Sequence, residues 1–172
     1  MPAVGLVVLG LDPGTATLGY AVVEDVGGKL RLVDHGAVRT SPRQELGERL
    51  RALHLGVAEV IGRHAPTEVA VEKLFFGKNA TSAVMVGQAR GVAVLAAAQC
   101  GLPVREYSPA EVKQAVTQYG NARKEQVQEM VRVLLGLPTV LRPDDAADAA
   151  AIAICHVHMR HGERVYAQMA GA

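Results

Sequence analysis

The chain has 172 residues and a formal net charge of +1; 49% of its residues are hydrophobic and only 3% are aromatic. This length fits one globular domain over residues 1–172, and the balanced charge neither indicates nor excludes a nucleic-acid partner. The longest apolar stretch is far below the roughly 20 residues that cross a bilayer, and two isolated cysteines without a secretory leader argue against a disulfide scaffold, so we expect a cytoplasmic protein without membrane association.

The first half of the chain contains four apolar segments of strand length. They cover residues 4–12, 18–24, 30–38 and 67–74. Short turns join the first three, which must therefore be antiparallel neighbours, and the first strand, apolar on both faces, is the central one. Residues 41–44 (SPRQ) have the form of a capping box, which predicts a helix from there to about residue 64. Because a helix connects them, the fourth strand should lie parallel to the first.

The second half is predicted to be mainly helical. Residues 83–99 are apolar nearly all round, which predicts a buried helix, and residues 102–108 form a fifth strand. A capping box at 108–111 begins the next helix, another runs through 127–135, and Asp144 is the expected N-cap of the last. The order predicts an α/β fold: a five-stranded mixed sheet with strands 1–3 antiparallel, strands 4 and 5 parallel to strand 1, and flanking helices.

Four carboxylates are predicted to meet at one edge of this sheet. Asp12 and Glu72 end two parallel strands, at the edge where open α/β sheets usually bind ligands, and Asp145 and Asp148 share a face of the last helix. Simpler roles exist for three of them: a turn residue at Asp12, a salt-bridge partner at Glu72 and a helix-dipole partner at Asp145. Together they would repel one another without a cation. Their oxygens suit Mg²⁺ or Mn²⁺, and two such ions can promote displacement at phosphorus.

Basic and aromatic residues are predicted beside the carboxylates. Lys113 and Lys124 lie in early turns of two helices, where the helix dipole disfavours cations, which indicates a negatively charged ligand. The alternative is that both are solvated surface lysines. Phe75 and Phe76 are the only phenylalanines and follow the fourth strand in a polar connection. We expect one to stack on unpaired bases while Lys78 meets phosphate, and the other to close the core.

Four segments, taken in order and at their spacing, resemble the RuvC family of bacterial Holliday-junction resolvases. They are GLDPGT…GY, VAVEKLFFGKNATSAVMVGQARGVA, VKQAVTQYGNARKEQV and DAADAAAIAICHVH. The resemblance covers essentially the whole chain. It implies an RNase H-like fold, a homodimer, and Mg²⁺-dependent symmetric nicking of four-way DNA junctions in recombination and repair. It also implies contact with the RuvA–RuvB branch-migration complex.

The same resemblance assigns roles to individual residues. The family's four catalytic carboxylates, which would hold the metal, fall on Asp12, Glu72, Asp145 and Asp148. The aromatic residue that engages junction bases falls on Phe75. Lys113 and Lys124 match lysines implicated in catalysis or strand binding, and Lys78 stands where relatives carry a basic residue. Some members of the family have His in place of Asp145. How much Asp145 contributes to catalysis compared with Asp148 is therefore open.

Two other functions are compatible with parts of the sequence. An actin-like phosphotransferase or ATPase shares the strand-1 aspartate and Gly-rich turn, but such proteins usually need two of these subdomains, for which 172 residues leave little room. A non-catalytic junction-binding protein would use only the basic residues, and it explains the acidic cluster poorly because uncompensated carboxylates repel DNA. ATP turnover without DNA would favour the first, and tight binding without a Mg²⁺-dependent product the second.

Overall fold

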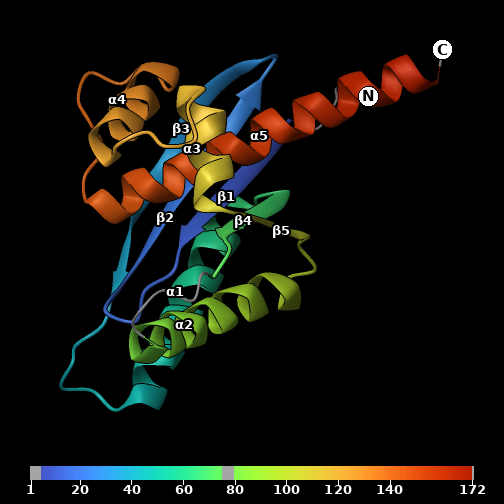
Figure 1. Cartoon of the computed structure of the whole chain (residues 1–172). Coiled ribbons are helices and arrows are strands. Elements are labelled where there is room, and N and C mark those ends of the chain that lie inside the picture. Colours follow the sequence, from blue (N-terminus) through green and yellow to red (C-terminus); the bar gives the residue numbers. More distant parts are fainter. Residues whose placement is uncertain (1–4, 75–79, 172) are drawn as a thin grey trace.

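A mixed β-sheet with helices on both faces forms the centre of the molecule (Figure 1). The computed structural model describes residues 5–74 and 80–171. In chain order the elements are β1 Leu6–Asp12, β2 Thr17–Val26, β3 Lys29–Arg39, α1 Leu46–His64, β4 Glu68–Glu72, α2 Ala80–Gln99, β5 Val104–Tyr107, α3 Pro109–Thr117, α4 Lys124–Leu134 and α5 Asp144–Ala170. In these residues the sheet order is β3-β2-β1-β4-β5. The first three strands are antiparallel, and β1, β4 and β5 are parallel, as predicted.

The alternation of side chains along β1 separates two hydrophobic cores. Leu6 and Val8 face the layer of α3, α4 and α5, whereas Leu9 and Leu11 face α1 and α2. Asp12 continues the first series, so its side chain lies on the α5 side of the sheet. The strand is central and apolar on both faces, which is why the sequence gives no simple alternation there.

Helix α5 lies with its backbone directly on the sheet and crosses several strands (Figure 1). A methyl group on Gly10 would come within 2.9 Å of the Ala153 nitrogen, and one on Gly19 within 2.7 Å of Asp145 Cβ. Glycine on the strands and alanine on the helix therefore allow an approach that larger side chains would prevent. This packing carries the first turns of α5 to the sheet edge where β1 and β4 end.

The predicted start of the first long helix is wrong. Residues 41–44 make only one of the two bonds of a capping box: the Ser41 amide donates to Gln44 Oε1 at 2.9 Å, but the Gln44 amide donates to the Ser41 carbonyl at 3.1 Å, and Ser41 Oγ accepts from the Arg43 amide instead. These bonds close a turn, after which Glu45 is extended and α1 begins at Leu46. The prediction for Asp144 is also off by one residue, because Pro143 is the N-cap and Asp144 already belongs to α5.

The prediction that the α2 segment is buried holds for only one face. Ala89 and Ala93 are fully buried against the sheet and α1, whereas Val84 is 57% and Leu95 50% exposed. An apolar helix need not be enclosed by its own chain, and a second apolar face of this kind is available to another molecule.

In the described part of the chain, no helix is both long enough and apolar enough to cross a membrane.

Candidate active site

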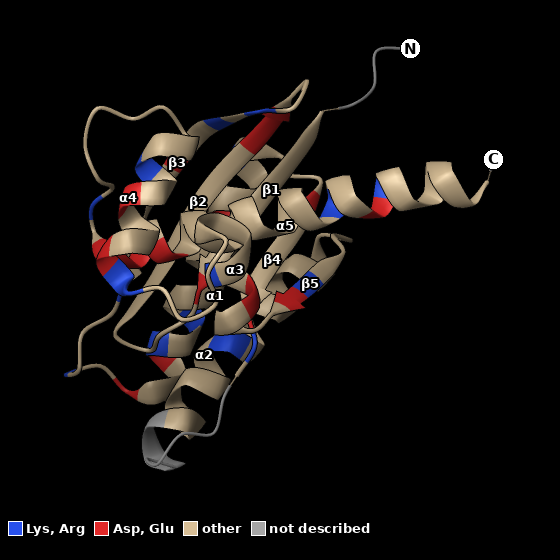
Figure 2. Ribbon diagram, turned by 45° about the horizontal axis from the view of Figure 1, so that its top comes forward, with Lys and Arg blue, Asp and Glu red and all other residues tan. Residues whose placement is uncertain are grey.

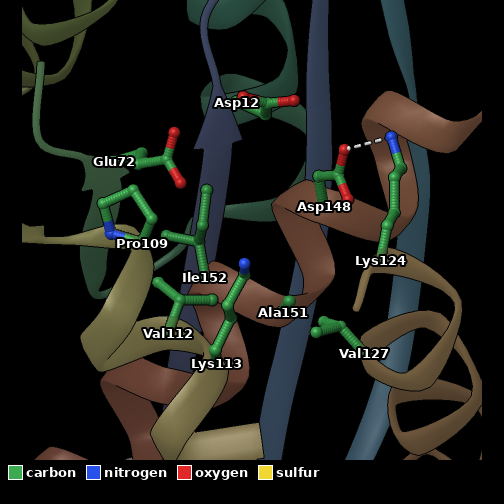
Figure 3. Close-up of a pocket in the computed structure, with 10 residues that line it drawn as sticks. All are labelled: Asp12, Glu72, Pro109, Val112, Lys113, Lys124, Val127, Asp148, Ala151 and Ile152. Carbon is green, nitrogen blue, oxygen red and sulfur yellow. Dashed lines mark hydrogen bonds and ion pairs between the residues drawn. The ribbon is translucent and has the colours of Figure 1, made fainter. Parts of the chain in front are cut away.

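Three of the four predicted carboxylates line one pocket at the carboxyl ends of β1 and β4. Asp12 and Glu72 end strands that pair in parallel, and both face α5; Asp148 comes from the second turn of that helix. Figure 3 shows the three carboxylates above an apolar floor. The cavity has a volume of about 210 Å³. Its lining consists of Asp12, Glu72, Pro109, Val112, Lys113, Lys124, Val127, Asp148, Ala151 and Ile152.

The electrostatics of the pocket are dominated by crowded negative charge. Burial, followed by the charges of Asp148, Glu72 and Asp145, raises the pKa of Asp12 to about 7, while Lys124 opposes them. The pKa of Glu72 is also raised, first by burial and then by Asp148, while Lys113 lowers it. The carboxylates therefore interact electrostatically, although Asp12 and Asp148 are 136 residues apart in the sequence.

Asp145 lies beside this pocket rather than in its lining. It is in the first turn of α5, with its backbone over Gly19, and of the three acidic neighbours it contributes least to raising the pKa of Asp12. The structure thus brings Asp145 into the electrostatic cluster but places Asp148 closer to its centre.

The two predicted lysines stand on different walls of the pocket (Figure 3). Lys124, the first residue of α4, donates from Nζ to Asp148 Oδ2 at 2.9 Å and lies 3.8 Å from Asp144 Oδ2. The bond to Asp148 is the main reason why the pKa of Lys124 is raised. A cation at this helix start is thus tolerated because carboxylates of another helix face it, a reason that the sequence did not disclose.

Lys113 reaches the pocket because α3 starts at the end of β5. The predicted capping box is confirmed: the Glu111 amide donates to Ser108 Oγ at 3.2 Å, and the Ser108 amide donates to Glu111 Oε2 at 2.7 Å. Tyr107 ends β5 immediately before this cap. The local sequence therefore fixes where α3 begins, and with it the wall that carries Lys113.

Three residues of the predicted site fall outside the described part of the chain, and one part of the pocket was not predicted. Phe75, Phe76 and Lys78 lie outside the described residues. The apolar floor, formed largely by buried side chains of α3, α4 and α5, was not predicted as part of the site. Its signal was present in the helical spacing of Val127 and Val131, which marked a buried face without showing what that face adjoined.

The donor chemistry fits a divalent cation. Within residues 5–74 and 80–171, no three Asp, Glu, His or Cys side chains are close enough to enclose a metal ion. The converging groups nevertheless offer only carboxylate oxygens, the ligands that Mg²⁺ and Mn²⁺ prefer. A cation would also relieve the repulsion and desolvation that raise the pKa of Asp12. The residues present therefore fit such an ion, with Lys124 as the positive charge now paired to Asp148.

This electrostatic strain predicts a pH-dependent stability for the metal-free protein. The pKa of Asp12 is about 7 in the folded state, against an ordinary value of 3.8. Between these values the folded protein binds more protons than the unfolded chain, so the free energy of unfolding should fall as pH rises from about 4 to about 7, by roughly 4 kcal/mol. Urea unfolding in EDTA between pH 4 and 8 measures it.

The control for this titration is the variant Asp12→Asn, which cannot titrate at this position. The difference in unfolding free energy between wild type and variant should change over the same pH range, and Mg²⁺ should reduce that difference at pH 8. A difference that stays constant with pH would contradict the raised pKa of Asp12.

Comparisons with known proteins agree with this fold. The family model described as crossover junction endodeoxyribonuclease RuvC matches residues 8–156. A crossover junction endodeoxyribonuclease RuvC of Chloroflexus aggregans is 61% identical over 150 residues, which cover 87% of this chain and 92% of that protein. The structure of T. thermophilus RuvC in complex with Holliday junction substrate superposes with a TM-score of 0.86 at 44% identity, covering 90% of this chain and 94% of that one. The yeast mitochondrial Holliday junction resolvase, 14% identical with a TM-score of 0.63, shares the fold; the match covers 94% of this chain and 85% of that one.

The mixed sheet, its flanking helices and the carboxylates at its edge define the class as an RNase H-like nuclease. Within that class, the matching family model and the close relatives decide the assignment. The chain belongs to the RuvC family of crossover junction endodeoxyribonucleases.

Proposed function

We propose that this protein is a Mg²⁺-dependent endonuclease that resolves four-way DNA junctions by paired, symmetric nicks in recombination and repair. The observation that carries the proposal is the convergence of Asp12, Glu72 and Asp148 beside two lysines, in a chain that belongs to this family. A relative with 44% identity is known in complex with a Holliday junction. Family membership favours this activity over the actin-like phosphotransferase and the non-catalytic binder.

The charge of each pocket residue determines its proposed role: the carboxylates bind metal and Lys124 stabilises negative charge. Asp12, Glu72 and Asp148, with Asp145 at the side, would hold one or two Mg²⁺ ions, for which Mn²⁺ could substitute. The ions would supply an activated water and stabilise the leaving oxygen, giving 5′-phosphate and 3′-hydroxyl ends. Lys124, freed from Asp148 when a cation takes over that carboxylate, would add positive charge near the scissile phosphate.

Lys113 and the segment after β4 would bind the DNA strand. Lys113 lies on the α3 wall of the pocket, within electrostatic reach of Glu72, where an ammonium can meet a phosphate oxygen. Phe75 would engage unpaired bases and Lys78 a neighbouring phosphate, as the family resemblance implies. Acidic and basic residues are interspersed over the fold (Figure 2), so DNA binding depends on these local groups rather than on the net charge of +1.

A homodimer would supply the second nick. A four-way junction has approximate two-fold symmetry, so two active sites related by a two-fold axis make symmetric cuts most simply. The exposed apolar side chains Val84 and Leu95 on α2 support a face for self-association. We further propose a cytoplasmic location, which the two isolated cysteines favour, and contact with the RuvA–RuvB branch-migration complex, which the family resemblance suggests.

The test is a nicking assay with an end-labelled four-way junction and a linear duplex of matched sequence, each with Mg²⁺ or Ca²⁺. Paired nicks at symmetric positions of the junction, made with Mg²⁺ and not in the duplex, are the expected result. Adding ATP to DNA-free protein tests the phosphotransferase. Junction binding with no product under any cation would instead identify a non-catalytic binder.

A further inference from the structure

A buried histidine joins α5 to two strands of the sheet. His156 is completely buried and follows Asp148 by eight positions on the same helix. The hydroxyl of Tyr107, on β5, lies 2.8 Å from His156 Nδ1, and Glu68 Oε2, on β4, lies 2.9 Å from His156 Nε2. Both nitrogens of this imidazole therefore have protein partners, each on a different strand.

The chemistry of the partners allows one consistent set of hydrogen bonds. A carboxylate only accepts, so His156 Nε2 carries the proton and donates to Glu68, while Nδ1 accepts from the hydroxyl of Tyr107. The second oxygen of Glu68 accepts from Arg160 Nε at 3.2 Å. Burial lowers the pKa of His156 and raises that of Tyr107 to about 12, which keeps both groups neutral at neutral pH. We call Glu68, Tyr107 and His156 the α5 anchor.

The α5 anchor and the nuclease site share one helix and one strand. Asp148 and His156 are separated by about 12 Å along α5, at 1.5 Å per residue. Glu72 and Glu68 lie on the same face of β4 and are separated by about 13 Å, at 3.3 Å per residue. A bond between His156 and Glu68 therefore limits sliding and rotation of α5 about two turns from Asp148, on the strand that also carries Glu72. Tyr107 is in addition the register partner of Glu72 in the neighbouring strand.

Near the active site, α5 meets the sheet mainly through small side chains; larger buried side chains such as Ile154, and the bond from His161 to Asp25 on β2, lie farther along the helix. The buried side chains of its first turns are mostly alanines, including Ala146, Ala149 and Ala153, and they meet strands at glycine. Small side chains give close approach but only shallow ridges and grooves, so they resist rotation and sliding of a helix weakly. Hydrogen bonds are directional, and a buried polar group can define a single register.

We propose that Glu68, Tyr107 and His156 are positioning residues of the nuclease: their hydrogen bonds fix the rotation and axial position of α5, and thereby the place of Asp148 against Glu72. None of the three lines the pocket. The proposal rests on the proposed function, because it assigns these residues a role in the same reaction.

The test is Tyr107→Phe, which removes one hydroxyl and keeps the ring; Tyr166→Phe, the same change on the exposed end of α5, is the control. At saturating DNA, single-turnover nicking by Tyr107→Phe should fall at least about tenfold, since misplacing reacting groups by 1 Å can cost far more. Junction affinity should stay unchanged. In the metal-free protein, amide NMR signals of residues 145–149 should shift, although they lie about two to three turns from His156. The control should change neither rate nor these signals.

A second pair of variants separates positioning from folding. Glu68→Gln keeps an acceptor oxygen for His156 and should retain close to the wild-type rate, whereas Glu68→Met removes the acceptor and should lose as much as Tyr107→Phe. All assays are run well below each variant's melting temperature.

The outcomes distinguish this inference from the proposed function. A wild-type protein that does not nick the junction overturns the proposed function. Wild-type nicking together with an unchanged rate and unmoved 145–149 signals in Tyr107→Phe overturns the positioning role. A lower melting temperature without loss of rate also overturns it, because it identifies the anchor as purely structural.

Discussion

Replacing Asp12 by Asn should abolish junction nicking and at the same time stabilise the metal-free protein. The amide keeps the shape of the side chain but removes the charge that a cation would bind, so we expect the nicking rate to fall at least about 100-fold. Because burial and three carboxylates raise the pKa of Asp12 to about 7, its ionised form is costly without metal. The neutral variant should therefore unfold at higher urea concentration at pH 8 in EDTA.

Junction binding should persist in this variant, because the two lysines and the residues proposed to bind DNA, Phe75 and Lys78, are unchanged. Gel-shift titration with Ca²⁺, nicking with Mg²⁺ and urea unfolding give the three readouts. Glu59→Gln, an exposed carboxylate on α1, is the matched control and should leave all three unchanged. Asp12→Asn that still cuts at close to the wild-type rate would remove Asp12 from the mechanism.

Much of the site's location was predictable because strand connections limit the topology. Short turns force antiparallel pairing and a helical crossover favours parallel pairing, so the carboxyl ends of β1 and β4 had to meet. Asp12 and Glu72 follow directly from this rule. Asp148 followed from helical spacing in a run of alanines where a structural carboxylate has little purpose.

The contacts that hold the site together were not predictable in the same way. Lys124 pairs with Asp148 across 24 positions, and His156 bonds to Glu68 across 88. No local periodicity encodes such pairs, because they depend on how α4 and α5 rest on the sheet. The sequence pattern around His156 does not indicate its partners. The false start of α1 has a local cause: Ser41 and Gln44 bond to each other as their spacing suggests, but these bonds close a turn instead of a helix.

Gly19→Ala should both destabilise the protein and inactivate it. A strand interior is normally more stable with alanine than with glycine. Here, however, the methyl group of alanine would collide with the carbonyl oxygen of Asp145 and lie 2.7 Å from Asp145 Cβ. The obstacle is helix backbone, which cannot rotate away as a side chain can. The first turns of α5 must lift from β2, which should cost about 1–3 kcal/mol of unfolding free energy. The same movement carries Asp145 and Asp148 away from Asp12.

Nicking should therefore fall by about 100-fold in Gly19→Ala, since a shift of 1 Å in a catalytic group has an effect of this size. Gly62→Ala, within α1 and with no atom near the added methyl group, is the matched control. It should raise the free energy of unfolding by about 0.5–1 kcal/mol, because a helix is more stable with alanine than with glycine. Nicking should be unchanged. Urea unfolding and the junction assay measure both variants. If Gly19→Ala kept wild-type stability and rate, the distance between α5 and the sheet would not be set by this backbone contact.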